Sequence, residues 1–239
     1  MRYLVISDIH ANLEALQAVL SHAEGLYDGI LNCGDLVGYG PDPNAIVDWC
    51  RAHTPLVVRG NHDKACVQLD HLEWFNPAAR DSAVWTNSQL TEDNREYLRL
   101  LPQGPLEVEK FQILHGSPGD EDEYLVNVAD AEYAARFLDR QLSFFGHTHV
   151  QGGFYFTRSG TKRIGQEAIQ VEDTAVYLIN PGSVGQPRDH DPRAAYAIFS
   201  TDNRWVEYRR VEYDIARTQA KIQEAGLPPS LAERLHFGV

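Results

Sequence analysis

Five short polar motifs contain the residue types that bind metal ions and transfer protons. They are Asp8-Ile9-His10, Gly34-Asp35, Gly60-Asn61-His62-Asp63, His115-Gly116 and Gly146-His147-Thr148-His149. Carboxylate oxygen, imidazole nitrogen and amide oxygen form a mixed donor set that suits divalent ions such as manganese, iron or zinc, and the motifs contain no thiolate that would favour a structural zinc site. Together the motifs indicate a site that binds two divalent metal ions.

Taken singly, each motif has a plainer explanation. Gly-Asn-His-Asp is common as a turn, because Gly and Asn tolerate a left-handed backbone. A lone histidine is more often a structural residue than a ligand, and Gly-Asp is a frequent turn. For a site without chemistry, all of these explanations would have to hold at once, and seven polar side chains would crowd together without a function.

Each motif directly follows an apolar run that is typical of a β-strand, at residues 2–7, 29–33, 56–58, 111–114 and 142–145. Because the carboxyl ends of parallel strands meet at one edge of a sheet, a parallel sheet would bring the motifs together there. The spacing of two residues in Asp8-x-His10 and His147-x-His149 would let both side chains of an extended pair face the same side.

The remaining pattern predicts an α/β fold, because strands alternate with helices over the first 60 residues, at 12–23 and from Asp42 to about Arg51. Residues 64–101 break this alternation. Asn76-Pro77 and Thr91 are typical of helix starts, so we expect a helical insertion beside the site, with its aromatics Trp74, Phe75, Trp85 and Tyr97 in the core rather than on substrate. Further strands are expected at 153–158, 168–171, 175–179, 195–199 and 205–211, and helices at 130–139 with an acidic N-cap, at 214–225 and at 230–233 with a capping box.

Length and composition predict one domain over residues 1–239, because 239 residues of 43% apolar composition can bury one large core. No apolar run is long enough to span a bilayer and no cleavable signal precedes the first strand, so we expect a cytoplasmic protein with no membrane partner. The odd number of cysteines favours reduced, buried thiols. A net charge of -13 argues against non-specific binding to nucleic acid.

The motif order D-x-H, GD, GNHD, HG and GHTH resembles that of the calcineurin-like metallophosphoesterase superfamily, in particular its small prokaryotic phosphodiesterase and phosphatase members. The resemblance extends over essentially the whole chain. It implies an α/β (α+β) fold in the form of a four-layer α-β-β-α sandwich, with two mixed β-sheets flanked by helices.

The same resemblance implies a role for each site residue. One metal ion would be held by Asp8, His10 and His149, the other by Asn61, His115 and His147, with Asp35 bridging the two. His62 would handle protons, and Asp63 would orient it. Two divalent ions are implied, with manganese expected first and iron, nickel or zinc as alternatives. A hydroxide bridging the ions would attack phosphorus in line.

Three further residues are candidate substrate contacts. Arg188 follows a loop, Asn180-Pro181-Gly182-Ser183, that also resembles a loop of small prokaryotic members, and its guanidinium would grip two phosphate oxygens. Asn12 is a candidate contact, although capping of the following helix is the stronger interpretation. Tyr39, in a loop just past Asp35, would stack on a base or an aryl leaving group.

The expected activity is hydrolysis of small phosphate esters or nucleotides, with phosphodiesters favoured. A phosphomonoesterase, including a protein phosphatase, and a dinucleoside polyphosphate hydrolase remain alternatives, because the same two ions serve all three. A non-enzymatic interaction scaffold, as in the retromer subunit of the superfamily, is disfavoured because His62 and all seven expected ligands are present. The sequence does not indicate an oligomer interface.

Overall fold

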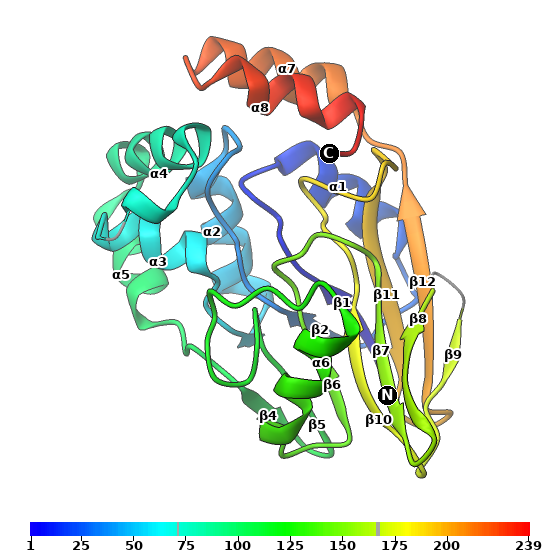
Figure 1. Ribbon diagram of the computed structural model, residues 1–239. Helices are drawn as coiled ribbons and strands as arrows, with labels where there is room; N and C mark the ends of the chain where they lie inside the picture. The colour runs from blue at the N-terminus through cyan, green and yellow to red at the C-terminus, as the bar shows by residue number, and fades with distance from the viewer. Residues whose placement is uncertain (71, 166–167) are drawn as a thin grey trace.

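Two mixed β-sheets form the centre of the protein, and helices cover their outer faces (Figure 1). The computed structural model describes residues 1–70, 72–165 and 168–239. The first sheet has the strand order β3 (Leu56–Val57), β2 (Gly29–Asn32), β1 (Arg2–Ile6), β11 (Ala194–Ser200), β12 (Trp205–Val211) and β9 (Ile169–Gln170). The second has the order β4 (Leu106–Val108), β5 (Phe111–Ile113), β6 (Leu142–Phe144), β10 (Val176–Asn180), β7 (Gly152–Thr157) and β8 (Gly160–Ile164).

Parallel pairing is confined to two groups of strands. In the first sheet β1, β2 and β3 are parallel, and in the second β5, β6 and β10 are parallel, whereas the other pairs are antiparallel. The expectation of a single parallel sheet edge is therefore wrong. The strands that precede the polar motifs lie in both sheets, as the two-sheet sandwich implied by the resemblance requires.

Side chains along a strand alternate between its two faces, and this alternation places them in two different hydrophobic layers. On β1, Tyr3 and Val5 pack between the sheets, while Leu4 and Ile6 pack on the other face against α1 (Leu13–His22) and α2 (Pro43–His53). Successive side chains of a strand point to opposite faces, so one strand serves two cores. The outer face of the second sheet packs against α6 (Val128–Ala134). The four-layer α-β-β-α sandwich is thus confirmed.

Helical elements follow β3: α3 (Asn61–Gln68), a 3-10 turn (Leu72–Trp74), α4 (Pro77–Gln89) and α5 (Glu92–Leu100). Residue 71, inside the expected insertion, lies outside the described residues. The side chains of Asn76 and Thr91 cap α4 and α5 as predicted. Trp85 and Tyr97 pack against buried clusters, but Trp74 is 83% exposed, so the expectation of a core position is wrong for that residue.

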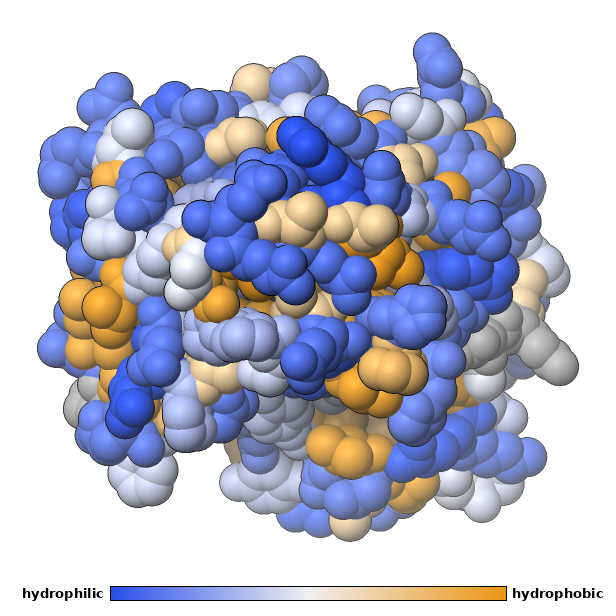
Figure 2. All heavy atoms as spheres, turned by 90° about the horizontal axis from the view of Figure 1, so that it is seen from above, coloured by the Kyte–Doolittle hydropathy of each residue, from blue (hydrophilic) through white to orange (hydrophobic). Residues whose placement is uncertain are grey.

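Helices α7 (Ile215–Glu224) and α8 (Pro229–Glu233) lie together at the top of Figure 1 and are followed by a 3-10 turn (Arg234–His236). Their apolar residues Ile222, Leu231 and Leu235 pack with Tyr39. Lys221 of α7 forms ion pairs with Glu14 and Asp42. Seen from above, this end of the molecule is mainly hydrophilic, with hydrophobic side chains in separate groups (Figure 2).

Several predicted boundaries were wrong. The helix expected at 130–139 begins at Val128 with Asn127 as its N-cap, and Asp130 instead completes a capping box from the third helical position. The last short helix begins at Pro229 without a side-chain cap, because the residue at its N-cap is Pro228. Strands β4 and β8 were not expected, since β8 is mostly polar and exposed at the sheet margin.

The cysteines Cys33, Cys50 and Cys66 are free and buried, as predicted. Within the described residues, no helix has both the length and the apolar character needed to cross a membrane.

Candidate metal centre

The ends of five strands deliver the polar motifs to one place between the sheets. The residues expected as ligands are all buried, with exposed fractions of at most 7%: Asp8 and His10 after β1, Asp35 after β2, Asn61 at the start of α3 beyond β3, His115 after β5, and His147 and His149 after β6. Asp8 and His149, which are 141 positions apart in the sequence, thus lie in the same small volume.

The donors form two clusters that share Asp35. One contains Asp8, His10, Asp35 and His149, the other Asp35, His115 and His147, and in each the ligand atoms lie within 4.8 Å of one another. The Asn61 side-chain oxygen lies 3.2 Å from His115 Nε2 and so adds an amide donor to the second cluster. All seven residues expected as ligands thus belong to one of these clusters or adjoin it.

Backbone carbonyls fix which nitrogen of each ring faces the clusters. The Nδ1 atoms of His10, His115 and His149 hydrogen-bond to the carbonyls of Val37 (3.0 Å), Cys33 (2.7 Å) and Gln186 (2.6 Å). In His147 the roles are reversed, because Nε2 lies 3.2 Å from the carbonyl of Asp122. A carbonyl only accepts, so in each neutral ring the second nitrogen keeps a lone pair for a cation.

The site contains acceptors that no protein donor satisfies. His10 Nε2 and His149 Nε2 lie 3.1 Å apart, although each ring already uses its Nδ1 proton elsewhere. The Oδ2 atoms of Asp8 and Asp35 are buried and have no hydrogen-bond partner among the described residues. Buried acceptors without partners are costly. Divalent cations would satisfy all four atoms, so the donor set fits two such ions.

Electrostatics in the metal-free protein favour the same conclusion. Burial lowers the pKa of His147 to about 3 and holds the pKa values of His10 and His149 well below the usual range, so these rings are neutral and able to coordinate. For His115, burial is outweighed by the carboxylates of Asp35 and Asp8, which raise its pKa to about 10. Metal binding must therefore release a proton from His115.

The ligand loops have an unusual backbone. Asp8, His10, Asp35, His147 and His149 have φ values of 54°, 48°, 55°, 66° and 59°. Residues other than glycine seldom adopt this left-handed region, and its cost is typical of functional sites. The expectation that Asp8-x-His10 and His147-x-His149 are extended pairs is therefore wrong. Hydrogen bonds hold the loops, since the N–H groups of Asp8 and His10 donate to the carbonyls of Gly34 and Asp35.

His62 lies at the edge of the ligand clusters. Its ring packs against those of Tyr39, His10 and Phe75, with centroid distances of 4.3, 5.0 and 5.0 Å, and its Nδ1 has no partner among the described residues. Burial lowers its pKa to about 4, so the ring is neutral near pH 7. The ring contacts His10 of the first cluster and lines the cavity, so it is placed to form a hydrogen bond with a bound substrate.

Asp63 supports the site through the backbone. Its carboxylate accepts hydrogen bonds from the N–H groups of Leu36 (2.8 Å), Val37 (3.1 Å) and Gly60 (3.0 Å). Among the described residues it makes no hydrogen bond with the ring of His62. Asp63 therefore fixes the loop after Asp35 and the start of α3, and its influence on His62 is indirect.

Arg188 lies close to the clusters without an acidic partner. Its Nη2 donates to the hydroxyl of Tyr39 (3.3 Å) and to the side-chain oxygen of Gln186 (3.0 Å), and its Nε has no partner. No ion pair involves Arg188 within the described part of the chain. A guanidinium in this state is ready to bind an anion.

The other two candidate substrate contacts are already engaged in the fold. The ring of Tyr39 is buried between His10 and His62 and beneath the Arg188 guanidinium, so no ring face is free for a base. The Asn12 oxygen caps α1 through the N–H of Ala15, and its amide donates to the carbonyl of Gly185. Both side chains therefore contribute to the shape of the site from within the fold.

The loop of Asn180-Pro181-Gly182-Ser183 also supports the site through hydrogen bonds to the backbone. Asn180 donates to the carbonyl of Gly146 (2.7 Å), and Ser183 donates to the carbonyl of Asp8 (2.8 Å). The loop thus supports the backbone beside two ligand motifs.

Two residues near the ligands were missed from the sequence. Tyr124 stacks on His147 with a centroid distance of 3.7 Å, and the carbonyl of Asp122 holds the same ring. Both belong to the loop between β5 and α6, which has no periodicity or motif. Only its position directly after His115-Gly116 could have pointed to it.

Comparison with known proteins identifies the family. The family model described as the calcineurin-like phosphoesterase superfamily domain matches residues 1–204. The chain belongs to this superfamily. The resemblance inferred from the motifs is thereby confirmed, and membership implies that the chain is a phosphoester hydrolase.

Relatives cover the whole chain. An uncharacterized protein of Methanocaldococcus jannaschii is 36% identical over 241 residues, which is 98% of this chain and 97% of the relative. The crystal structure of a metallophosphoesterase from Sphaerobacter thermophilus is 45% identical, with a TM-score of 0.88 over 100% of this chain and 99% of that one. A hypothetical protein from Pyrococcus horikoshii shares the fold at 19% identity, with a TM-score of 0.81 over 100% of this chain and 98% of that one.

Metal removal is expected to lower thermal stability. An ion that binds only the folded state, at a free concentration of 100 times its Kd, adds about 2.7 kcal/mol, and at this chain length 1 kcal/mol corresponds to roughly 2–4 °C. We therefore expect manganese-loaded protein to melt roughly 5–10 °C above protein treated with chelator for each ion that binds at this excess. Differential scanning calorimetry with and without chelator measures the difference, and equal melting temperatures at full metal loading would contradict the centre.

Proposed function

We propose that the chain is a phosphoesterase that depends on two divalent ions and favours phosphodiesters. It would act in the cytoplasm on small phosphate esters or nucleotides, as one domain over residues 1–239 with a helical insertion at about 64–101. In this proposal one ion is held by Asp8, His10 and His149, the other by Asn61, His115 and His147, and both by Asp35. Manganese is the first candidate, ahead of iron, nickel or zinc.

Bound ions of this kind neutralise phosphate oxygens and lower the pKa of water to the neutral range. The residues of the chain bind and orient the ester. Arg188 grips phosphate oxygens, and its position is held by the hydroxyl of Tyr39 and the amide of Gln186. His62, neutral near pH 7, supplies a hydrogen bond to the leaving oxygen. Asp63 keeps the loop of Asp35 in place through its three backbone hydrogen bonds.

One observation carries the proposal: two donor clusters share a buried carboxylate and adjoin an open cavity. Asp35 Oδ2 has no hydrogen-bond partner among the described residues, and it lies 3.5 Å from His10 Nε2 and 3.4 Å from His115 Nε2. Asn61 and His147 of the second cluster line the cavity, together with His62, so an ester can reach the donors from this cavity.

The preference for diesters is supported by the charges around the cavity. Among the described lining residues, the cation Lys64 is already paired with Glu121 at 2.9 Å and Asp122 at 2.6 Å. Arg188 is then the one guanidinium near the clusters that we assign to substrate. A diester carries one negative charge and a monoester nearly two, so beyond the two metal ions the diester requires less positive charge from the lining than the monoester does.

A metal-by-substrate matrix on purified protein tests the function. An aryl diester, an aryl monoester, a cyclic nucleotide and a dinucleoside polyphosphate would each be tested against Mn, Ni, Fe, Zn and Mg. We expect the highest kcat/KM for the aryl diester with manganese, and no turnover with chelator. A higher value for the monoester or the polyphosphate would favour the corresponding alternative. Metal-loaded protein that hydrolyses none of the esters would favour the interaction scaffold.

Arg188→Gln is expected to raise KM for the aryl diester about tenfold, because hydrogen bonds to charged groups contribute about 1.5–3 kcal/mol. Arg188→Lys should recover only part of the loss, since a lysine cannot grip two oxygens at once. Arg193→Gln, which alters an exposed arginine paired with Asp191, is the matched control and should leave KM unchanged. An unchanged KM in Arg188→Gln would remove Arg188 from the binding site.

A further inference from the structure

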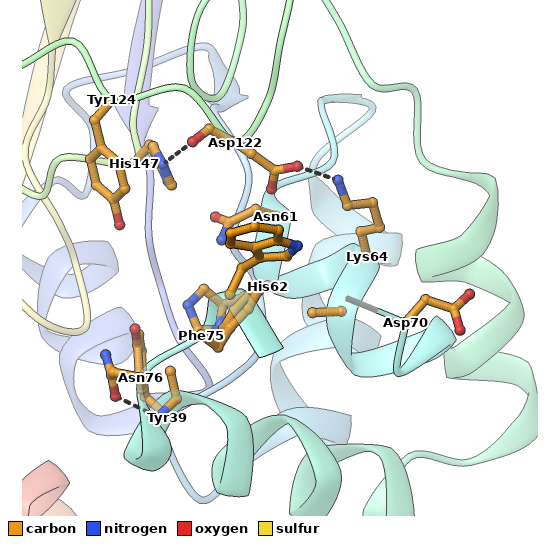
Figure 3. Close-up of a pocket in the computed structure, with 13 residues that line it drawn as sticks. Tyr39, Asn61, His62, Lys64, Asp70, Phe75, Asn76, Asp122, Tyr124 and His147 are labelled. Atoms are coloured by element: carbon orange, nitrogen blue, oxygen red, sulfur yellow. Dashed lines mark hydrogen bonds and ion pairs between the residues drawn. The ribbon is translucent and has the colours of Figure 1, made fainter. Parts of the chain in front are cut away.

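A cavity of about 510 Å³ adjoins the ligand clusters and has aromatic walls (Figure 3). Its lining includes Trp74, Phe75 and Tyr124, together with His62 and His147 of the site. Trp74 and Phe75 come from the helical segment after α3, and Tyr124 comes from the loop before α6. Two segments far apart in the sequence thus contribute aromatic side chains to one space.

The aromatic side chains extend directly from the reacting centre. The ring of Tyr124 stacks on His147 at 3.7 Å and 29°, and Phe75 contacts the edge of His62 at 5.0 Å. A phosphate bound at the clusters would therefore place its ester group among these rings. Trp74 and Tyr124 are 83% and 48% exposed, so they keep large apolar surfaces in water at the mouth of the cavity. Such surfaces are typical of sites that bind another apolar group.

The charges of the lining side chains argue against a second phosphate group or a cationic group as the occupant of the cavity. Lys64 is neutralised by Asp122 and Glu121, and Glu121 is also paired with Arg59 at 2.8 Å. Within the described lining, no unpaired cation is left for a second phosphate. The carboxylate of Asp70 points away from the aromatic side chains in Figure 3, so a cationic group would not find a counter-charge among them.

The lining also offers a polar contact suited to a base. The Asn76 oxygen accepts from the N–H of Ala79, but its amide nitrogen makes no hydrogen bond within the described part of the chain. This donor lines the same cavity. It can pair with a carbonyl or ring nitrogen of a stacked heterocycle.

We propose that the cavity binds a neutral planar aromatic group of the ester, held against Trp74, Phe75 and Tyr124. The substrate class is then phosphodiesters that carry a nucleoside or another aryl group. The inference rests on the proposed function, because it takes the phosphate to lie at the two donor clusters.

Binding to manganese-loaded protein tests this assignment by calorimetry. AMP and ribose 5-phosphate share a phosphate and a sugar and differ in the base. We expect AMP to bind about tenfold more tightly, as expected for one stacked base. Trp74→Ala should reduce this preference to about twofold, and Trp74→Phe should keep most of it. Trp205→Ala, at an exposed tryptophan of β12, is the matched control and should keep the full preference.

A second pair of ligands distinguishes the two sources of an aromatic group. Phenyl phosphate that exceeds methyl phosphate as strongly as AMP exceeds ribose 5-phosphate would indicate a general aryl pocket, whereas a gain limited to AMP would indicate a nucleoside. Equal binding of AMP and ribose 5-phosphate, an unchanged preference in Trp74→Ala, or tighter binding of phosphocholine than of AMP would each overturn the inference. The experiment measures binding and does not depend on turnover. A protein that binds AMP but hydrolyses no ester would contradict the proposed function and would still support the aromatic binding cavity.

Discussion

Asp35→Asn is expected to remove both metal ions and to lower kcat/KM for an aryl diester roughly a thousandfold, because metal charge stabilisation contributes several kcal/mol. One oxygen of Asp35 lies within 3.5 Å of a ring nitrogen from each cluster. An amide in its place loses the negative charge and adds N–H groups, which direct hydrogen atoms rather than lone pairs toward a cation. Elemental analysis of the purified variant and steady-state kinetics measure the two effects.

The variant itself should fold. Asparagine tolerates the left-handed backbone at this position, where φ is 55°. Asp48→Asn is the matched control, because Asp48 lies on the exposed side of α2 and pairs only with Arg51 among the described residues. It should retain two ions and full activity. If Asp35→Asn kept both ions at the affinity of the unaltered protein, the bridging role would be wrong.

His62→Ala is expected to keep both metal ions and to lose about 10²–10⁴ in kcat, which is the usual contribution of a positioned acid or base. The ring is buried and neutral, and it packs against His10 beside the ligand clusters without belonging to either of them. The loss should be largest for alkyl or phenyl esters and small for p-nitrophenyl esters, since a good leaving group needs little help from a proton donor.

Comparison of a poor leaving group with p-nitrophenol in His62→Ala therefore tests whether His62 assists the departure of the leaving group, as well as how much it contributes to kcat. His62→Gln, which keeps a hydrogen-bond donor, should recover part of the activity on the poor leaving group. His53→Ala, at an exposed histidine that packs on Trp49, is the control for general effects. A kcat equal to that of the unaltered protein on a poor leaving group would remove His62 from the proton-transfer step.

The positions of the donor residues could be predicted from the sequence because each follows an apolar strand. In a layered fold the ends of the parallel strands of both sheets lie at one edge of the sandwich. Asp35 and His115 are therefore in contact, although the strands that precede them belong to different sheets. The number of sheets did not follow from the strand pattern, since a run such as residues 111–113 has the same appearance in either sheet. The family resemblance supplied that information.

The backbone and the substrate side were less predictable. The left-handed turns at Asp8 and His147 depend on hydrogen bonds from distant segments, so their sequence neighbours do not reveal them. Trp74 was expected in the core, but it is exposed and lines the cavity. Tyr124 lies in a loop without a pattern, and only its stacking on His147 shows its relation to the site.

The left-handed turns that carry the ligands imply a trade-off between thermal stability and catalysis. Five donor residues occupy a conformation that glycine or asparagine adopts more easily, and two of them bury carboxylate oxygens that have no hydrogen-bond partner in the described part of the chain. Replacement of these residues would relieve the metal-free chain and destroy its chemistry. A search for sturdier variants should therefore hold these five positions fixed and look for its gains elsewhere in the scaffold.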